Sequence, residues 1–213
     1  PDGQRASGIG TEIAYAGSVG ALLAMHHFNT GNGTVIPELE GINNRCNIRL
    51  TTEVVDTASS GISAVQSLTS MLTRSPMSLS EPQPCAIFGS QVSAVTLRLA
   101  SLAGAYDLPQ VSSSAMDTAL NNPVQYPTFA RSHTDVAGFG EMSVSYLAEN
   151  LGVKHAGLFV PNDSYGLSFQ KHVLDAARYH GVEIIAVQYL ETSEEDIIVN
   201  LRALKKTGFN YFI

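Results

Sequence analysis

Residues 84–116 constrain the fold most, because they predict a strand, a helix and a second strand in immediate succession. Ala86–Phe88 is a short apolar run that stops at Gly89, as a buried parallel strand does. Ser90 is placed to cap the helix that follows. The apolar residues of that helix recur at steps of three and four: Val92, Val95, Leu99, Leu102 and Tyr106. The next strand begins at Gln110.

Both strands end in turns that carry serines, namely Ser90, Ser93, Ser112 and Ser114. Open α/β sheets bind ligands at the carboxyl ends of their strands. The free N–H groups of a helix start, together with serine hydroxyls, can receive a small anion such as a carboxylate. A plainer interpretation stays open, in which these hydroxyls only bond to backbone groups of the helix start and the loop.

The rest of the chain repeats the alternation of strand and helix, which favours an α/β fold with parallel sheets wrapped by helices. Strand-like runs occur at 48–55, 86–88, 110–111, 128–131, 155–160, 182–189 and 209–213. Helical periodicity occurs at 9–28, 60–72, 92–106, 139–151, 169–180 and 193–204, the last with Ser193 as its cap. The loop at 121–135 is the best predicted boundary between two such units.

Composition excludes several classes of protein. The chain has a formal charge of −7 and a pI of about 5.3, which argues against nucleic acid or an anionic membrane as the main partner. No stretch reaches the roughly 18–20 apolar residues that span a bilayer. Because the sequence starts at Pro1 and stops inside the apolar run 211–213, we expect a fragment of a longer protein.

The sequence contains none of the catalytic, metal-binding or cofactor-binding motifs that we looked for. The sequence has no G-x-S-x-G, H-E-x-x-H or phosphate-loop lysine, and Gly8-Ile-Gly10 lacks the third glycine of a dinucleotide fingerprint. The six histidines are scattered, and the two cysteines form no CxxC. The acidic run 194–196 suits the first turn of a helix. We therefore expect no enzymatic activity, no cofactor and no metal.

Four segments together carry a family likeness: Ile87-Phe-Gly-Ser-x-x-Ser93, Asp107-Leu-Pro-Gln-Val-Ser-Ser-Ser114, Tyr126-Pro-Thr-Phe-Ala-Arg131 and Val160-x-Asn-Asp-Ser-Tyr-Gly166. In this order the chain resembles the type I periplasmic-binding-protein-like fold. More narrowly, it is similar to the extracellular ligand-binding region of class C G-protein-coupled receptors and natriuretic-peptide receptors.

The resemblance implies two lobes with a ligand held in the cleft between them. It places the first lobe at 1–130, lacking its first strand, and the start of the second lobe at 131–213. Further strands of the second lobe would follow Ile213. The absent first strand would lie centrally, beside the strands at 48–55 and 85–89.

The resemblance also assigns roles to individual residues. Ser93 matches a serine that holds a ligand carboxylate, Ser114 matches a residue that contacts the backbone of an amino-acid ligand, and Tyr165 matches an aromatic residue that closes over the ligand. Met116 stands where amino-acid-binding members usually have a threonine, and a thioether accepts only weak hydrogen bonds. It therefore remains open whether the ligand is an amino acid or a more apolar molecule. Asp163 and Asp135 are candidates to face an amine, or to serve only as caps.

Receptors of this kind often have a disulfide in the first lobe, which would join Cys46 to Cys85. With a strand between them, the two cysteines would be roughly 9–10 Å apart, beyond the roughly 7 Å that a disulfide spans. A disulfide and two free thiols both stay open. Two sequons, at Asn32 and Asn162, would accept glycans in a secreted protein.

The function that we expect is a receptor ectodomain that binds a small molecule and signals by closure of its lobes. It would be attached to a membrane-spanning segment outside this sequence and could dimerise through the first lobe. Two alternatives remain: a soluble, periplasmic or secreted binding protein of a transport system, or an α/β enzyme of flavodoxin-like form.

Overall fold

The computed structural model describes residues 9–75, 78, 82–190, 194–208 and 210–213 of the 213-residue chain. The chain divides into two compact units, Pro1–Asp56 and Thr57–Ile213. The predicted lobe boundary near residue 130 lies within the second of these units and stays a prediction.

The first unit is built on one long helix, α1 (Ile9–Thr30). It ends at Gly31, whose φ of 65° is the left-handed conformation that the sequence predicts for this stop. Two short 3₁₀ turns follow, η1 (Pro37–Leu39) and η2 (Ile42–Asn44). The helix confirms the helical periodicity predicted over 9–28, and it stops at Gly31.

Residues 48–55 were predicted to form a strand, and that prediction is wrong. The segment has no regular secondary structure, and the structure pairs it with no strand among the described residues. Instead the side-chain amide of Asn29 makes two hydrogen bonds to the backbone of Leu50. It donates to the carbonyl and accepts from the N–H, each at 2.8 Å. An amide side chain thus satisfies backbone groups that a neighbouring strand would otherwise satisfy.

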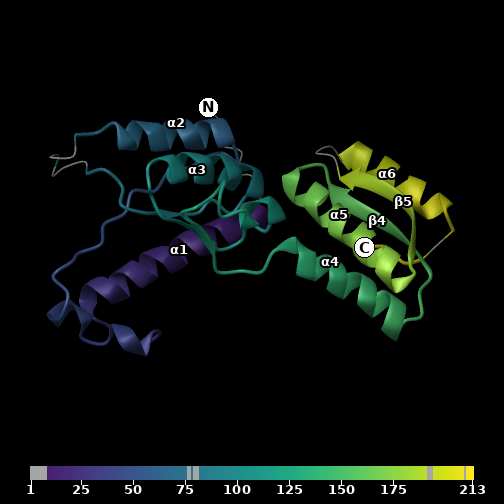
Figure 1. Ribbon diagram of the computed structural model, residues 1–213, viewed down its shortest axis with the longest axis horizontal. Coiled ribbons are helices and arrows are strands. Elements are labelled where there is room, and N and C mark those ends of the chain that lie inside the picture. The colour runs from purple at the N-terminus through teal and green to yellow at the C-terminus, as the bar shows by residue number, and fades with distance from the viewer. Residues whose placement is uncertain (1–8, 76–77, 79–81, 191–193, 209) are drawn as a thin grey trace. The chain divides into compact units, whose positions relative to one another are not determined.

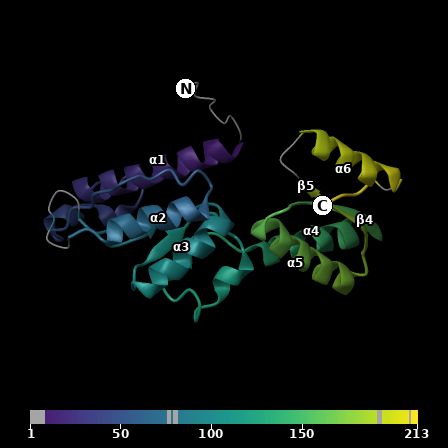
Figure 2. The ribbon, with the colours of Figure 1, turned by 90° about the horizontal axis from the view of Figure 1, so that it is seen from above.

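The second unit opens with a small parallel sheet in the order β1-β2-β3. Its elements are α2 (Gly61–Leu72), β1 (Ile87–Phe88), α3 (Ser93–Ala105), β2 (Gln110–Ser112), the 3₁₀ turn η3 (Thr118–Asn121) and β3 (Phe129–Arg131). Helices α2 and α3 lie side by side (Figure 2) and bury Leu68 against Val95 and Leu99. The three predicted strands and the two helices are confirmed.

A second parallel sheet pairs β4 with β5. Its elements are α4 (Val136–Ser145), the π turn η4 (Tyr146–Asn150), β4 (His155–Pro161), α5 (Ser164–His180), β5 (Glu183–Leu190) and α6 (Glu194–Lys206). The chain end runs parallel to β4 through a bridge between Gly157 and Phe212, as the predicted strand over 209–213 requires. Phe209 and Ser193, the predicted cap of α6, lie outside the described residues.

Helices α4 and α5 pack closely against each other beside this sheet (Figure 1). Their approach depends on Gly140, where a Cβ would lie 3.1 Å from the backbone of His172 and Val173. Val144, Leu158 and Val173 are fully buried in the shared core, and burying each such side chain contributes about 1.5–3 kcal/mol.

The architecture is therefore α/β, with parallel sheets flanked by helices, as the alternation of the sequence predicts. Within the described residues, no helix combines the length and the apolar character that crossing a membrane requires.

Candidate ligand-binding site

The backbone carbonyl of Ser90, just after β1, joins the turns that follow β1 and β2. It accepts hydrogen bonds from the hydroxyl of Ser112 at 2.6 Å and from that of Thr96 at 2.8 Å. Gln110, which is fully buried, donates from Nε2 to the carbonyl of Gly89 at 2.6 Å. Three side-chain donors therefore hold the backbone carbonyls of Gly89 and Ser90, the residues that follow β1.

Ser112 and Ser114 both bond to backbone groups. The buried hydroxyl of Ser112 also accepts from the N–H of Ala115 at 3.0 Å and, more weakly, from that of Ser114 at 3.4 Å. The hydroxyl of Ser114 donates to the carbonyl of Gln91 at 3.2 Å. These bonds tie the turn after β2 to the turn after β1, and contact of either serine with a ligand stays a prediction.

Ser90 does not cap α3, so that prediction is wrong. The helix begins at Ser93, and its N-cap residue is Val92, which makes no side-chain capping bond. The hydroxyl of Ser90 accepts from the N–H of Val92 at 3.2 Å instead. Its carbonyl is held by Ser112 and Thr96, Val92 is extended, and the helix starts at Ser93, two residues later than a cap at Ser90 would place it.

The start of α3 is consequently open, in contrast to three other helices of the same unit. Side-chain oxygens cap α2, α4 and α5, from Ser60, Asp135 and Asp163 respectively. The N–H groups of a first helical turn have no acceptor within the helix, so an uncapped start attracts an anion. Only at α3 among these four does a valine occupy the capping position.

Ser93 is the first residue of this open helix and is only 5% exposed. Its hydroxyl oxygen accepts from the N–H groups of Met116 at 3.2 Å and Asp117 at 3.3 Å. A hydroxyl has two acceptor sites and one hydrogen. Both acceptor sites are filled, so the hydrogen is left to donate, and the described residues offer it no recorded acceptor.

Arg131, at the end of β3, holds the other side of this turn, a role that sequence reasoning missed. Its guanidinium donates to the carbonyls of Ala115 at 2.8 Å and Asp117 at 3.2 Å, and to Oδ1 of Asn121 at 2.6 Å. Burial lowers the pKa of Arg131, while the charges of Asp135 and Asp117 act against that. The one available signal was its place at the carboxyl end of a strand, in line with the serine turns.

Asp135 caps α4, accepting from the N–H of Ala137 at 3.0 Å and from Nδ2 of Asn121 at 2.7 Å. The bond from Asn121 is the largest cause that holds the pKa of Asp135 below its usual value, with help from the Ala137 bond and the Arg131 charge and against its desolvation. Asp135 therefore has the capping role that the sequence allowed for it.

Asp163 and Tyr165 lie together at the start of α5. The carboxylate of Asp163 caps the helix by accepting from the N–H of Gly166 at 2.8 Å. The half-buried ring of Tyr165 stacks on Phe169, one turn further along, with ring centroids 6.5 Å apart. Gly166 is needed because a Cβ there would collide with the carbonyl of Pro161.

One contact connects the turn after β2 with α5. The N–H of Thr118 donates to the hydroxyl of Ser168 at 3.3 Å, and the two hydroxyls lie 3.0 Å apart. Nε2 of His172 reaches the Thr118 hydroxyl at 3.3 Å. Thr118 follows Met116 by two residues, and Ser168 follows Tyr165 by three, so the contact joins the segments that carry the two sets of predicted ligand residues.

Two cavities occur elsewhere. One of about 640 Å³ lies between α6, β4 and the chain end, and includes Leu204, Phe159 and Ile213 in its wall. The other, of about 570 Å³, lies in the first unit between the end of α1 and residues 43–49. Neither is lined by the predicted ligand-binding residues, although Cys46, a candidate for the disulfide, lies in the wall of the second.

The cysteines and sequons can be placed as well. Cys46 is half-buried, Cys85 is exposed, and no bond joins them; they belong to different units, so the disulfide stays a prediction. Asn162 is exposed in the turn before α5, and Asn32 is partly exposed after α1. Among the described residues, no group of three or more His, Cys, Asp or Glu side chains is arranged to hold a metal ion.

The parallel sheets flanked by helices have the α/β architecture of the type I periplasmic-binding-protein-like fold. The profile of the receptor family ligand binding region matches residues 38–213. The chain belongs to this family, which confirms the resemblance drawn from its four motifs. No curated protein matches the chain.

Proposed function

We propose that this chain is the extracellular ligand-binding region of a membrane receptor, and that it binds a small carboxylate, amino-acid-like in form, between two lobes. The start of α3 with Ser93, here called the α3 half-site, receives the carboxylate. Residues 163–169, here called the α5 half-site, close over the ligand. Closure is the signal, because a ligand that binds the closed form better shifts the population toward it.

The open start of α3 is the observation that carries this proposal. The donors there are the N–H groups of Ser93 and Ala94 and the hydroxyl hydrogen of Ser93, to which Val92 brings no side-chain oxygen. The N–H of Val95 already donates to the carbonyl of Val92 at 3.1 Å. Three other helices of the unit bring their own oxygen to this position. A bound carboxylate would supply the acceptor that the sequence does not, through charge-assisted hydrogen bonds.

The link between Thr118 and Ser168 supports a role for α5. It connects the turn that is held by Ser93 to the helix that carries Tyr165. A ligand at the α3 half-site would therefore affect a segment that already bonds to α5. Tyr165 would supply an aromatic face, and the Asp163 carboxylate would face the ammonium group of an amino-acid-like ligand.

Family membership supports the receptor setting, because regions of this kind are typically extracellular. An extracellular setting would permit a glycan at the exposed Asn162, a second at Asn32, and a disulfide between Cys46 and Cys85. Attachment to a membrane span outside this sequence and dimerisation through the first lobe belong to the same proposal.

Titration calorimetry with L-leucine, L-glutamate and succinate tests the proposal. These three probes share a carboxylate but differ in charge and in the presence of an amine. At least one should bind, and Ser93→Ala should weaken it about tenfold, because one hydrogen bond to a charged group is lost.

Ser101→Ala is the matched control. It removes a hydroxyl from the same helix, where Ser101 donates only to the carbonyl of Leu97 at 3.0 Å. Affinity should not change in this variant. Binding by none of the three probes, or equal affinities for Ser93→Ala and the unaltered chain, would overturn the proposal.

A further inference from the structure

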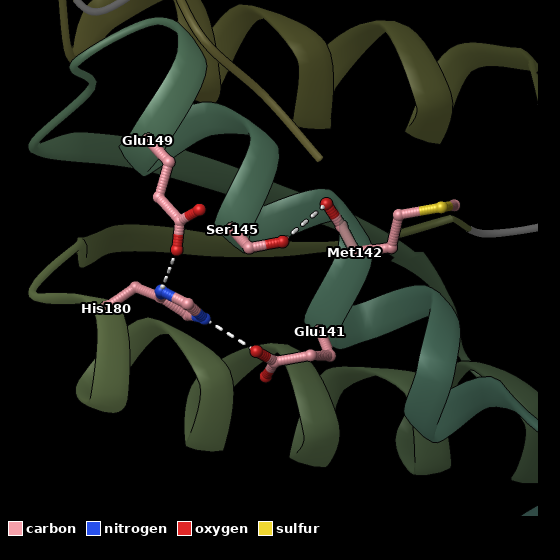
Figure 3. A network of polar contacts seen from close by, with 5 residues as sticks. All are labelled: Glu141, Met142, Ser145, Glu149 and His180. Carbon is pink, nitrogen blue, oxygen red and sulfur yellow. Dashed lines mark hydrogen bonds and ion pairs between the residues drawn. The ribbon is translucent and has the colours of Figure 1, made fainter.

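His180, the last residue of α5, lies between two carboxylates (Figure 3). Its Nε2 is 2.6 Å from Oε1 of Glu141 on α4. Its Nδ1 is 3.2 Å from Oε1 of Glu149 in the π turn. Both ring nitrogens therefore face carboxylate oxygens, which is more than the helix-end position of this histidine predicts.

Proton counting decides which form of the ring this geometry suits. A neutral imidazole has one N–H and one lone pair, so one of its two nitrogens would place a lone pair against a carboxylate oxygen. An imidazolium has an N–H on both nitrogens and can donate to both carboxylates at once. Only the protonated ring can donate to both carboxylates at once.

The π turn explains how two glutamates eight residues apart reach one ring. In an unbroken α-helix, eight steps of about 100° leave the two side chains about 80° apart around the axis. A π turn has more residues per turn and therefore rotates less per residue. It carries Glu149 back toward the face of Glu141, so that the helix distortion itself aligns the pair.

The ring is well enclosed, whereas its two carboxylate partners are largely exposed. The His180 side chain is 10% exposed, whereas those of Glu141 and Glu149 are 53% and 66% exposed. The negative end of α5 also attracts a positive charge. The edge of the neighbouring Tyr179 ring, 5.0 Å away between centroids, is uncharged, and Arg178 pairs with Asp175 on its own helix.

We propose that His180, Glu141 and Glu149 form a proton-dependent clamp that fastens the end of α5 to α4 and its π turn. The clamp is closed when the imidazole holds its second proton. Losing that proton leaves one carboxylate with water in place of a ring N–H, which removes a link between the two helices. The clamp therefore contributes stability at acidic pH and loses it as pH rises.

Urea unfolding of the full 213-residue chain at about pH 5.5 and about pH 8.5 tests this, because imidazole ordinarily changes charge between these values. His180→Gln should raise the unfolding equilibrium constant about fivefold at the lower pH, the scale of partly exposed ion pairs. At the higher pH the increase should be less than about twofold.

Two further variants make the test decisive. Glu149→Gln removes one exposed carboxylate and should lessen the pH dependence, even if His180→Gln does not fold. His155→Gln is the control, because it removes a histidine that lies 3.4 Å from a different carboxylate, that of Glu183 on β5. An effect of His180→Gln that is equal at both pH values, or a pH dependence that Glu149→Gln leaves unchanged, would overturn the clamp.

Discussion

Two helices that are both expected to face the ligand begin in opposite ways. Helix α3 starts after Val92 with no side-chain cap, whereas α5 starts after Asp163, whose carboxylate accepts from the N–H of Gly166 at 2.8 Å. The positive end of a helix attracts anions, so α3 is open to one and α5 already has one. The two half-sites therefore suit opposite charges on a ligand.

This difference bears on the kind of ligand. In the proposed site a carboxylate would lie at the α3 half-site and an ammonium group would face Asp163, which together describe an amino-acid-like molecule. Met116 replaces the threonine expected in amino-acid-binding members, yet its backbone N–H is bonded to Ser93. The charge complement could thus come from Asp163 although the side chain at position 116 is apolar.

The largest effect is expected when α3 is given an acidic N-cap residue like that of α5, which removes the difference between the two helix starts. Val92→Asp places a carboxylate at the N-cap, where the backbone is already extended with φ of −84°. We expect a gain of about 1 kcal/mol in the free energy of unfolding, because the helix acquires a cap. Affinity for the carboxylate probe should fall about 100-fold, because its charged hydrogen bonds are replaced and like charges meet. Urea unfolding and calorimetry measure the two effects.

Val92→Ala is the matched control, since it shortens the side chain without adding a cap. Affinity should stay within about twofold of the unaltered chain. If Val92→Asp bound the probe as tightly as Val92→Ala, the open start of α3 would not be the carboxylate site.

A smaller effect on affinity is expected from a change at the start of α5. Asp163→Asn retains a side-chain oxygen for the cap but removes the charge. Affinity for an amino acid that binds should fall about tenfold, because a charge-assisted bond becomes a neutral one. Affinity for succinate, which has no amine, should not fall. Calorimetry with both probes separates these outcomes, and equal losses for the two would contradict a charge-specific role.

The contrast also explains what could be predicted from the sequence. The start and the end of α5 depend on neighbours in the chain: Asp163 bonds three residues ahead, and Gly181 stops the helix with φ of 67°. Such local signals are visible in a sequence. The alternation of strands and helices is visible for the same reason, and it gave the correct fold class.

The errors share a different cause. Ser90 has every local feature of a cap, but its carbonyl is held by Ser112, 22 residues away, and the helix starts later. Residues 48–55 have strand-like composition, but Asn29 takes up the backbone groups of Leu50 from 21 residues away. In both cases a long-range hydrogen bond outweighs a local preference, and no local pattern records the partner.

The central claim is that the hydrogen of Ser93 and the open start of α3 bind a ligand carboxylate. A thermodynamic cycle tests it most directly, by comparing the tightest-binding probe acid and its methyl ester on the unaltered chain and on Ser93→Ala. We predict that the ester binds the unaltered chain at least tenfold more weakly than the acid does. In Ser93→Ala this ratio of affinities should shrink at least threefold, because the variant has lost a donor that bonds well only to the charged carboxylate. An acid-to-ester ratio that is the same in both proteins would contradict the account.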